Sequence, residues 1–156
     1  MKNLVIVRHA ECGNDVRINP HGREQMQRLF QRLHLLIGGG PILVLASSAP
    51  RAMDSAEILV REFDHADLDV AIEKHEVLWS DAHHPENIPA VLDLLGQSRD
   101  RADTIMIVTH LEYASELPER FTLRESWPEC IPLIGVDRGQ AVLLDCVNRK
   151  YRYVRS

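Results

Sequence analysis

The sequence lacks a basic excess, a long apolar run and a usable set of cysteines. Its 156 residues carry a net charge of -5 and no block of lysines and arginines, which argues against nucleic acid or an anionic membrane as the main partner. No apolar run approaches the roughly 18 residues that span a bilayer. The three cysteines are an odd number without metal-ligand spacing, so they predict neither a disulfide framework nor a metal site. A cytoplasmic location is the simplest interpretation.

The chain also lacks internal repeats, low-complexity tracts and linker-like stretches. We therefore expect residues 1–156 to form a single domain. Apolar residues make up 45% of the sequence and charged residues 26%, which are ordinary fractions for a globular domain with a real core.

Three short apolar stretches each run into basic side chains. Their continuous apolar character is typical of strands buried on both faces of a parallel sheet. The stretches and their basic residues are Leu4–Val7 with Arg8 and His9, Ile42–Ala46 with Arg51, and Ile105–Val108 with His110. Open α/β sheets bind ligands beyond the carboxyl ends of their strands. We therefore expect these four basic side chains to meet in one pocket.

Helical patterns separate the apolar stretches. Apolar residues at the spacing of one helix face predict a helix from His21 to Ile37, and Gly38 is a suitable residue to end it. A second helix is expected from Pro50, because proline is well tolerated in a first turn. Strands that alternate with helices predict a three-layer α/β/α fold with a mostly parallel central sheet.

The second half of the chain has weaker signals. A helix is expected from about Pro85 to Leu95, with Gly96 as its cap, and a shorter one from Leu111 to about Leu117. Pro118 is expected to stop or bend that helix. The remaining expected segments are an irregular stretch from Phe121 to Gly139 and two final strands, Gln140–Val147 and Tyr151–Val154.

The residues around the strand ends resemble the motifs of one family. Arg8-His9-Ala10-Glu11 resembles the Arg-His-Gly/Ala-Glu signature of the histidine phosphatase superfamily. Further segments resemble the family's helix start, its Ser-rich second block and its third block. They are Arg17-Ile18-Asn19-Pro20-His21-Gly22, Ser47-Ser48-Ala49-Pro50-Arg51-Ala52 with Ser55-Ala56-Glu57, and Val108-Thr109-His110. The resemblance extends from Lys2 to about Leu117 and implies a phosphoglycerate mutase-like fold.

The resemblance implies a phosphatase that needs no metal or other cofactor. Arg8 and Arg51 would bind phosphoryl oxygens through forked hydrogen bonds, and a protonated His110 would supply a further donor. His9 would attack phosphorus in its neutral form, and water would then hydrolyse the phosphohistidine. The nearby arginines favour that neutral form. We expect a backbone carbonyl near Gly13 or Asn14 to hold the other ring nitrogen of His9.

The loop after the first strand is expected to overhang the site. It carries Asn14 and Arg17, which we predict as additional phosphate contacts.

The general acid is harder to assign. The family often carries a Leu-x-Glu pattern after the third strand, whereas this chain has Leu78-Trp79-Ser80-Asp81. Asp81 is therefore our first candidate, followed by Glu76 and then by His83 or His84.

The small size of the chain resembles bacterial phosphohistidine phosphatases, because mutases of the superfamily are generally longer. However, Leu111-Glu112-Tyr113 replaces the Asn-Pro-Gly that is typical of those phosphatases. The expected partner is a phosphorylated small molecule or a phosphoprotein.

Two other interpretations of the function remain. One is a regulatory domain that binds phosphate or phosphoprotein without turnover, and the other is a phosphoglycerate mutase. The oligomeric state cannot be derived from the sequence.

Overall fold

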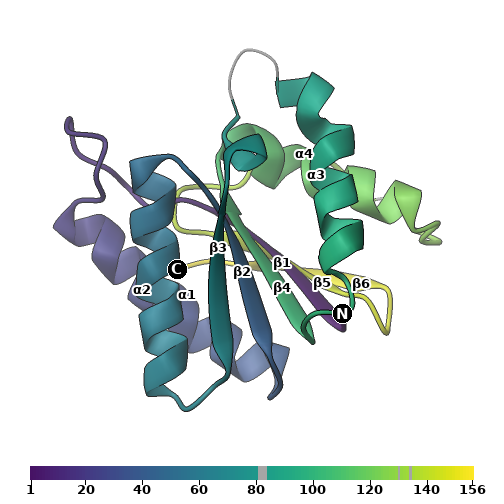
Figure 1. The fold of residues 1–156 in the computed structure, drawn as a ribbon, viewed down its shortest axis with the longest axis horizontal. Helices are drawn as coiled ribbons and strands as arrows, with labels where there is room; N and C mark the ends of the chain where they lie inside the picture. The colour runs from purple at the N-terminus through teal and green to yellow at the C-terminus, as the bar shows by residue number, and fades with distance from the viewer. Residues whose placement is uncertain (81–83, 130, 134) are drawn as a thin grey trace.

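The architecture consists of a central sheet between two helical layers. The computed structural model describes the whole chain except residues 81–83, 130 and 134. Six strands form one sheet in the order β3-β2-β4-β1-β5-β6 (Figure 1). The strands are β1 (Asn3–Arg8), β2 (Ile42–Ser47), β3 (Val70–His75), β4 (Thr104–Thr109), β5 (Ala141–Asp145) and β6 (Lys150–Val154). The fold class predicted from the sequence is confirmed.

The central strands are parallel and in register at their carboxyl ends. β4 lies between β1 and β2, with Val108 opposite both Val7 and Ala46. β3 pairs with β2 in the same direction, whereas β5 pairs antiparallel with β1, and β6 antiparallel with β5. The residues that follow β1, β2 and β4 are therefore brought to the same edge of the sheet.

Two helices cover each face of the sheet. The helices α1 (Pro20–Ile37) and α2 (Pro50–His65) lie on one side, and α3 (His84–Ser98) and α4 (Leu111–Arg124) on the other (Figure 1). A single 3-10 turn, η1 (Glu76–Leu78), follows β3. Alternate residues of β1 divide between two apolar clusters, with Val5 and Val7 on the α1 face and Leu4 and Ile6 on the other. This division explains why the sequence shows a continuous apolar run.

The start of α1 is fixed by a cap and a close backbone contact. The Asn19 side chain accepts a hydrogen bond from the Gly22 backbone at 2.7 Å, and Pro20 occupies the first turn. A β-carbon at Gly22 would lie 2.2 Å from the Glu11 carbonyl oxygen. Glycine is therefore required here, because it lets α1 approach the loop that follows His9.

Two predicted helix ends are wrong. α4 continues through Pro118 to Arg124, so the irregular stretch begins after Arg124 and not at Phe121. Its buried residues Tyr113, Leu117 and Phe121 pack in the second apolar cluster, and this burial outweighs the one hydrogen bond that proline removes. α3 likewise passes the exposed Gly96 and ends at Ser98, a buried residue.

The two final strands are confirmed, although β5 is shorter than predicted. The Asp145 carboxylate ends β5 by accepting hydrogen bonds from the backbone of Val147 and Asn148 at 3.1 and 2.9 Å. These contacts form the turn that leads to Lys150, where β6 begins. Among the residues that the structure describes, no helix combines the length and apolar character that crossing a bilayer requires.

A pair of glycine substitutions tests the contact beneath the His9 loop. Gly22→Ala must displace the Glu11 backbone, so we expect a markedly lower melting temperature. Gly96→Ala adds a methyl group into open space inside a helix and should stabilise by about 0.5–1 kcal/mol. Thermal unfolding of both variants checks this. Equal stability of the two variants would contradict the role assigned to Gly22.

Candidate active site

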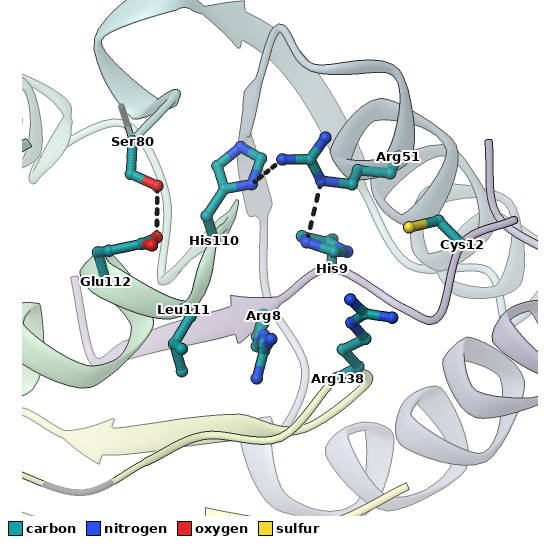
Figure 2. A pocket seen from close by; sticks show the side chains of 9 residues that line it. All are labelled: Arg8, His9, Cys12, Arg51, Ser80, His110, Leu111, Glu112 and Arg138. Atoms are coloured by element: carbon teal, nitrogen blue, oxygen red, sulfur yellow. Dashed lines mark hydrogen bonds between the residues drawn. The ribbon is translucent and has the colours of Figure 1, made fainter. Parts of the chain in front are cut away.

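A polar pocket lies beyond the carboxyl ends of β1, β2 and β4 (Figure 2). Its volume is about 290 Å³. The residues that line it are Arg8, His9, Cys12, Arg51, Ser80, His110, Leu111, Glu112 and Arg138. The four basic residues predicted to converge do lie in this one pocket.

His9 is held as a neutral imidazole with one defined tautomer. Its Nδ1 lies 2.7 Å from the Ala10 carbonyl oxygen, so this nitrogen carries the proton and donates it. The carbonyl is therefore that of Ala10 and not one near Gly13 or Asn14, because the chain turns directly after the strand. Nε2 accepts a hydrogen bond from Arg51 Nε at 3.1 Å, so its lone pair is directed at the pocket.

Burial and positive charge keep His9 unprotonated. The side chain is only 5% exposed. This burial lowers the pKa of His9 to about 4, and the charges of Arg51, Arg8 and Arg138 act in the same direction. The hydrogen bond to Ala10 opposes them. His9 is thus neutral at physiological pH, as attack by an imidazole requires.

His110 is also neutral. Its ring is 3% exposed, and burial, Arg51 and His9 lower its pKa to about 3. Arg51 Nη2 donates to Nδ1 at 3.1 Å, so the proton of His110 lies on Nε2 and is directed at Ser47 Oγ, 3.0 Å away. The donor role predicted for His110 therefore requires that Nδ1 gain a proton, which the negative charge of a bound phosphoryl group favours.

Arg51 bridges the two imidazoles from the first turn of α2. Figure 2 shows its guanidinium between the two rings, whose centroids are 5.2 Å apart. Ser55, one turn later, accepts a hydrogen bond from the Ala10 backbone at 3.0 Å and donates to the Arg51 carbonyl at 2.7 Å. Ser55, from the Ser55-Ala56 pair in the family-like motif, thus connects α2 to Ala10, which follows His9.

Arg8 and Arg138 add two more guanidinium groups. Arg8 Nη1 donates to the Val136 carbonyl at 2.9 Å, and its buried Nε has no partner among the described residues. Burial and the charge of Arg138 lower the pKa of Arg8. Arg138 precedes Gly139, whose backbone donates to the Arg8 and His9 carbonyls at 3.2 Å. Sequence analysis missed Arg138, because no strand-end signal precedes it.

Among the lining residues that the structure describes, Glu112 carries the single carboxylate. Ser80 Oγ donates to its Oε2 at 2.6 Å, and Figure 2 shows this pair with His110 between it and Arg51. Ser80 lies in the segment after β3, whereas Glu112 lies in the first turn of α4. Both residues lie at positions where the sequence differs from the family motifs, and the sequence analysis predicts no role for either.

Other predicted residues lie outside the pocket lining. Arg17 pairs with the buried Asp54, with a distance of 2.7 Å from Arg17 Nε to the carboxylate, and Asn14 is exposed. Glu76 is exposed and accepts a hydrogen bond from Ser48 Oγ at 2.7 Å. Asp81 and His83 lie outside the described residues, as does the side chain of His84. The roles predicted for these residues stay predictions.

The two lowered histidine pKa values predict acid sensitivity of the fold. Between pH 6.5 and about 4, the unfolded chain binds more protons than the folded one. The free energy of unfolding therefore falls as the pH is lowered through this interval. A His9→Gln/His110→Gln variant should lose less stability between pH 7 and pH 4.5 than the wild type, by thermal unfolding. His21→Gln changes an exposed histidine and is the control. An unchanged pH dependence in the double variant would contradict the assignment.

Arg138 and Arg17 should separate anion binding from stability. Arg138→Ala removes a charged donor from the pocket, so the Kd for inorganic phosphate should rise roughly 10–100-fold, as expected for a charge-assisted hydrogen bond. Arg17→Ala should change that Kd less than about twofold but cost about 1–2 kcal/mol of stability, because the buried Asp54 loses its charged partner. Calorimetric titration and thermal unfolding of both variants measure these effects. The opposite pattern would place Arg17 in the phosphate site.

Comparisons with known proteins agree with this architecture. No family model and no curated protein matches the sequence. Among solved structures, SixA of Nakamurella multipartitia, assigned as a phosphohistidine phosphatase, is 18% identical, with a TM-score of 0.65 over 92% of this chain and 83% of that one. An Escherichia coli protein assigned as an alpha-ribazole-5'-P phosphatase is 17% identical, with a TM-score of 0.66 over 99% and 96% of the two chains.

A third similar structure is a mycobacterial glucosyl-3-phosphoglycerate phosphatase. It is 15% identical, with a TM-score of 0.60 over 98% of this chain and 97% of that one. Identities this low establish the fold alone. The structural similarity agrees with the fold that the sequence motifs imply: the chain has a phosphoglycerate mutase-like fold.

Proposed function

We propose that the protein is a phosphatase in which His9 accepts the phosphoryl group. The observation that carries this proposal is the neutral His9, whose Nε2 accepts a hydrogen bond from Arg51 in a pocket that Arg8 and Arg138 also line. An uncharged nucleophile shares one pocket with three guanidinium groups, which suits phosphoryl transfer.

Substrate binding requires Arg51 to exchange partners. Its Nε and Nη2 donate to the two histidines in the structure. Phosphoryl oxygens are stronger acceptors than neutral imidazoles, because they carry charge. The entering group therefore draws these N–H groups onto its oxygens and releases the His9 lone pair for attack.

Transfer then proceeds in two steps. His9 Nε2 forms a bond to phosphorus while the bond to the leaving group breaks, and the electron pair of that bond goes to the leaving atom. The ring gains positive charge, which the Ala10 carbonyl stabilises through its contact with Nδ1–H. Water then attacks phosphorus, the P–N bond breaks, and inorganic phosphate leaves with His9 restored.

The substrate is a phosphomonoester or a phosphohistidine, on a small molecule or a protein. The similar structures support this range, since they include a protein assigned to phosphohistidine and a glucosyl-3-phosphoglycerate phosphatase. A pocket lined mainly by polar and charged groups recognises the phosphoryl group rather than an apolar body. A cytoplasmic location stays a prediction from the sequence.

Trapping the phosphorylated intermediate tests the proposal. Wild-type protein is mixed with an aryl phosphate, quenched without acid, and its intact mass is measured alongside phenol release. We expect a phosphate adduct on the wild type and on His21→Ala, an exposed-histidine control. His9→Ala should show no adduct and a loss of turnover of at least ~10³-fold.

Three outcomes would overturn the proposal. Full activity of His9→Ala would remove the nucleophile assigned here. Tight binding of vanadate by the wild type, without turnover of any phosphoester or phosphoramidate, would instead identify a phosphate-binding regulatory domain. Isomerisation of phosphoglycerates without net hydrolysis would indicate a mutase.

A further inference from the structure

The proposed reaction needs a proton donor for the leaving group, and the pocket offers one carboxyl group among its described lining residues. That group belongs to Glu112, in the first turn of α4. The other described candidate, Glu76, lies outside the lining and is held by Ser48. The candidate donor therefore lies in α4 and not in the loop after β3, where the sequence predicts it.

Glu112 lies on the side of the pocket where a leaving group would emerge. His9 and Glu112 both line the cavity, and Figure 2 shows Glu112 across it from His9 and Arg51. In-line displacement places the leaving atom on the far side of phosphorus from the attacking nitrogen. The negative charge of Glu112 partly opposes the burial and the positive charges that lower the pKa of Arg8 and of His110, so the carboxylate also lies close to the groups that bind the phosphoryl oxygens.

Ser80 fixes the position of this carboxylate. Its hydroxyl donates to Glu112 Oε2 at 2.6 Å, across 32 residues of sequence. A serine stands at the position where the family pattern carries its acid. A serine hydroxyl is too weak an acid to protonate a leaving group, but it can orient a donor supplied by the neighbouring helix.

We propose that Glu112 is the general acid and base of the reaction and that Ser80 is its positioning residue. This assignment rests on the proposed phosphatase function. In the first step, the P–O bond breaks, its electron pair goes to the leaving oxygen, and Glu112 transfers a proton to that oxygen. In the second step, the Glu112 carboxylate takes a proton from the attacking water, while the electron pair of the P–N bond returns to His9. Each turnover thus restores both groups.

Binding of the substrate supplies the condition that a proton donor needs. Arginine charges and the Ser80 hydroxyl favour the ionised carboxylate before binding. The phosphoryl group brings negative charge beside Glu112 and favours the protonated form. Glu112 is therefore protonated, and able to donate, when a substrate occupies the pocket.

The test compares leaving groups of different basicity. Glu112→Gln keeps the shape of the side chain and the contact with Ser80 but cannot transfer a proton. With an alkyl phosphate, whose leaving group needs a proton, kcat should fall ~10²–10⁴-fold. With p-nitrophenyl phosphate, whose leaving group is a stable anion, the fall in the rate of phosphoenzyme formation should stay under ~10-fold. Glu119→Gln, on the same helix outside the pocket lining, is the matched control.

A second variant keeps the proposal testable if Glu112→Gln folds poorly. Ser80→Ala should show the same leaving-group dependence with a smaller loss, about 10-fold on the alkyl phosphate. A merely structural effect would lower both rates equally. Equal losses on both substrates in both variants would therefore overturn the assignment. So would a leaving-group-dependent loss in Asp81→Asn with none in Glu112→Gln.

Failure of the donor assignment differs from failure of the phosphatase function. If the wild type forms no phosphohistidine, both proposals fall. If it forms the adduct and Glu112→Gln hydrolyses alkyl phosphates at the wild-type rate, only the donor assignment falls.

Discussion

The site depends on one guanidinium that is shared by two buried imidazoles. Arg51 donates to His9 Nε2 and to His110 Nδ1, both at 3.1 Å. Because arginine does not give up its proton, both acceptor nitrogens must be unprotonated. Burial reinforces this state, so the pKa values of both histidines fall to about 4 and about 3. The same contact thus fixes two tautomers, keeps His9 uncharged and holds a cation where phosphoryl oxygens would bind.

The fold makes that contact possible by bringing three strand ends to one edge. β4 lies between β1 and β2, so His110 enters the pocket between His9 and the start of α2. Both α2 and α4 begin at this edge, and the positive ends of their dipoles add to the field that favours an anion. Gly22 and Ser55 hold the loop after β1 against α1 and α2. The chemistry therefore relies on backbone contacts as much as on the charged groups.

Sequence patterns predicted the parts of this site that follow buried strands. Arg8, His9, Arg51 and His110 each follow an apolar run or open the helix behind it, and parallel strands force such positions together. Arg138 gave no comparable signal, because it precedes an antiparallel strand whose place in the sheet depends on long-range pairing. The pairing of Ser80 with Glu112 spans two elements and no local pattern encodes it. Pro118 misled the prediction of α4 because tertiary burial of one helix face overrides a local breaker.

The charge balance of the pocket depends both on the residues that the sequence predicts and on Arg138 and Glu112, which it does not. With both histidines neutral, the described lining residues carry three positive charges, on Arg8, Arg51 and Arg138, and one negative charge, on Glu112, which sum to +2. A phosphoryl dianion neutralises that sum. Protonated histidines would bind the anion more strongly but would remove the nucleophile. A bound dianion also favours protonation of Glu112, because its negative charge repels that of the carboxylate. The pocket therefore separates the two tasks: arginines bind the anion, while the uncharged His9 attacks phosphorus.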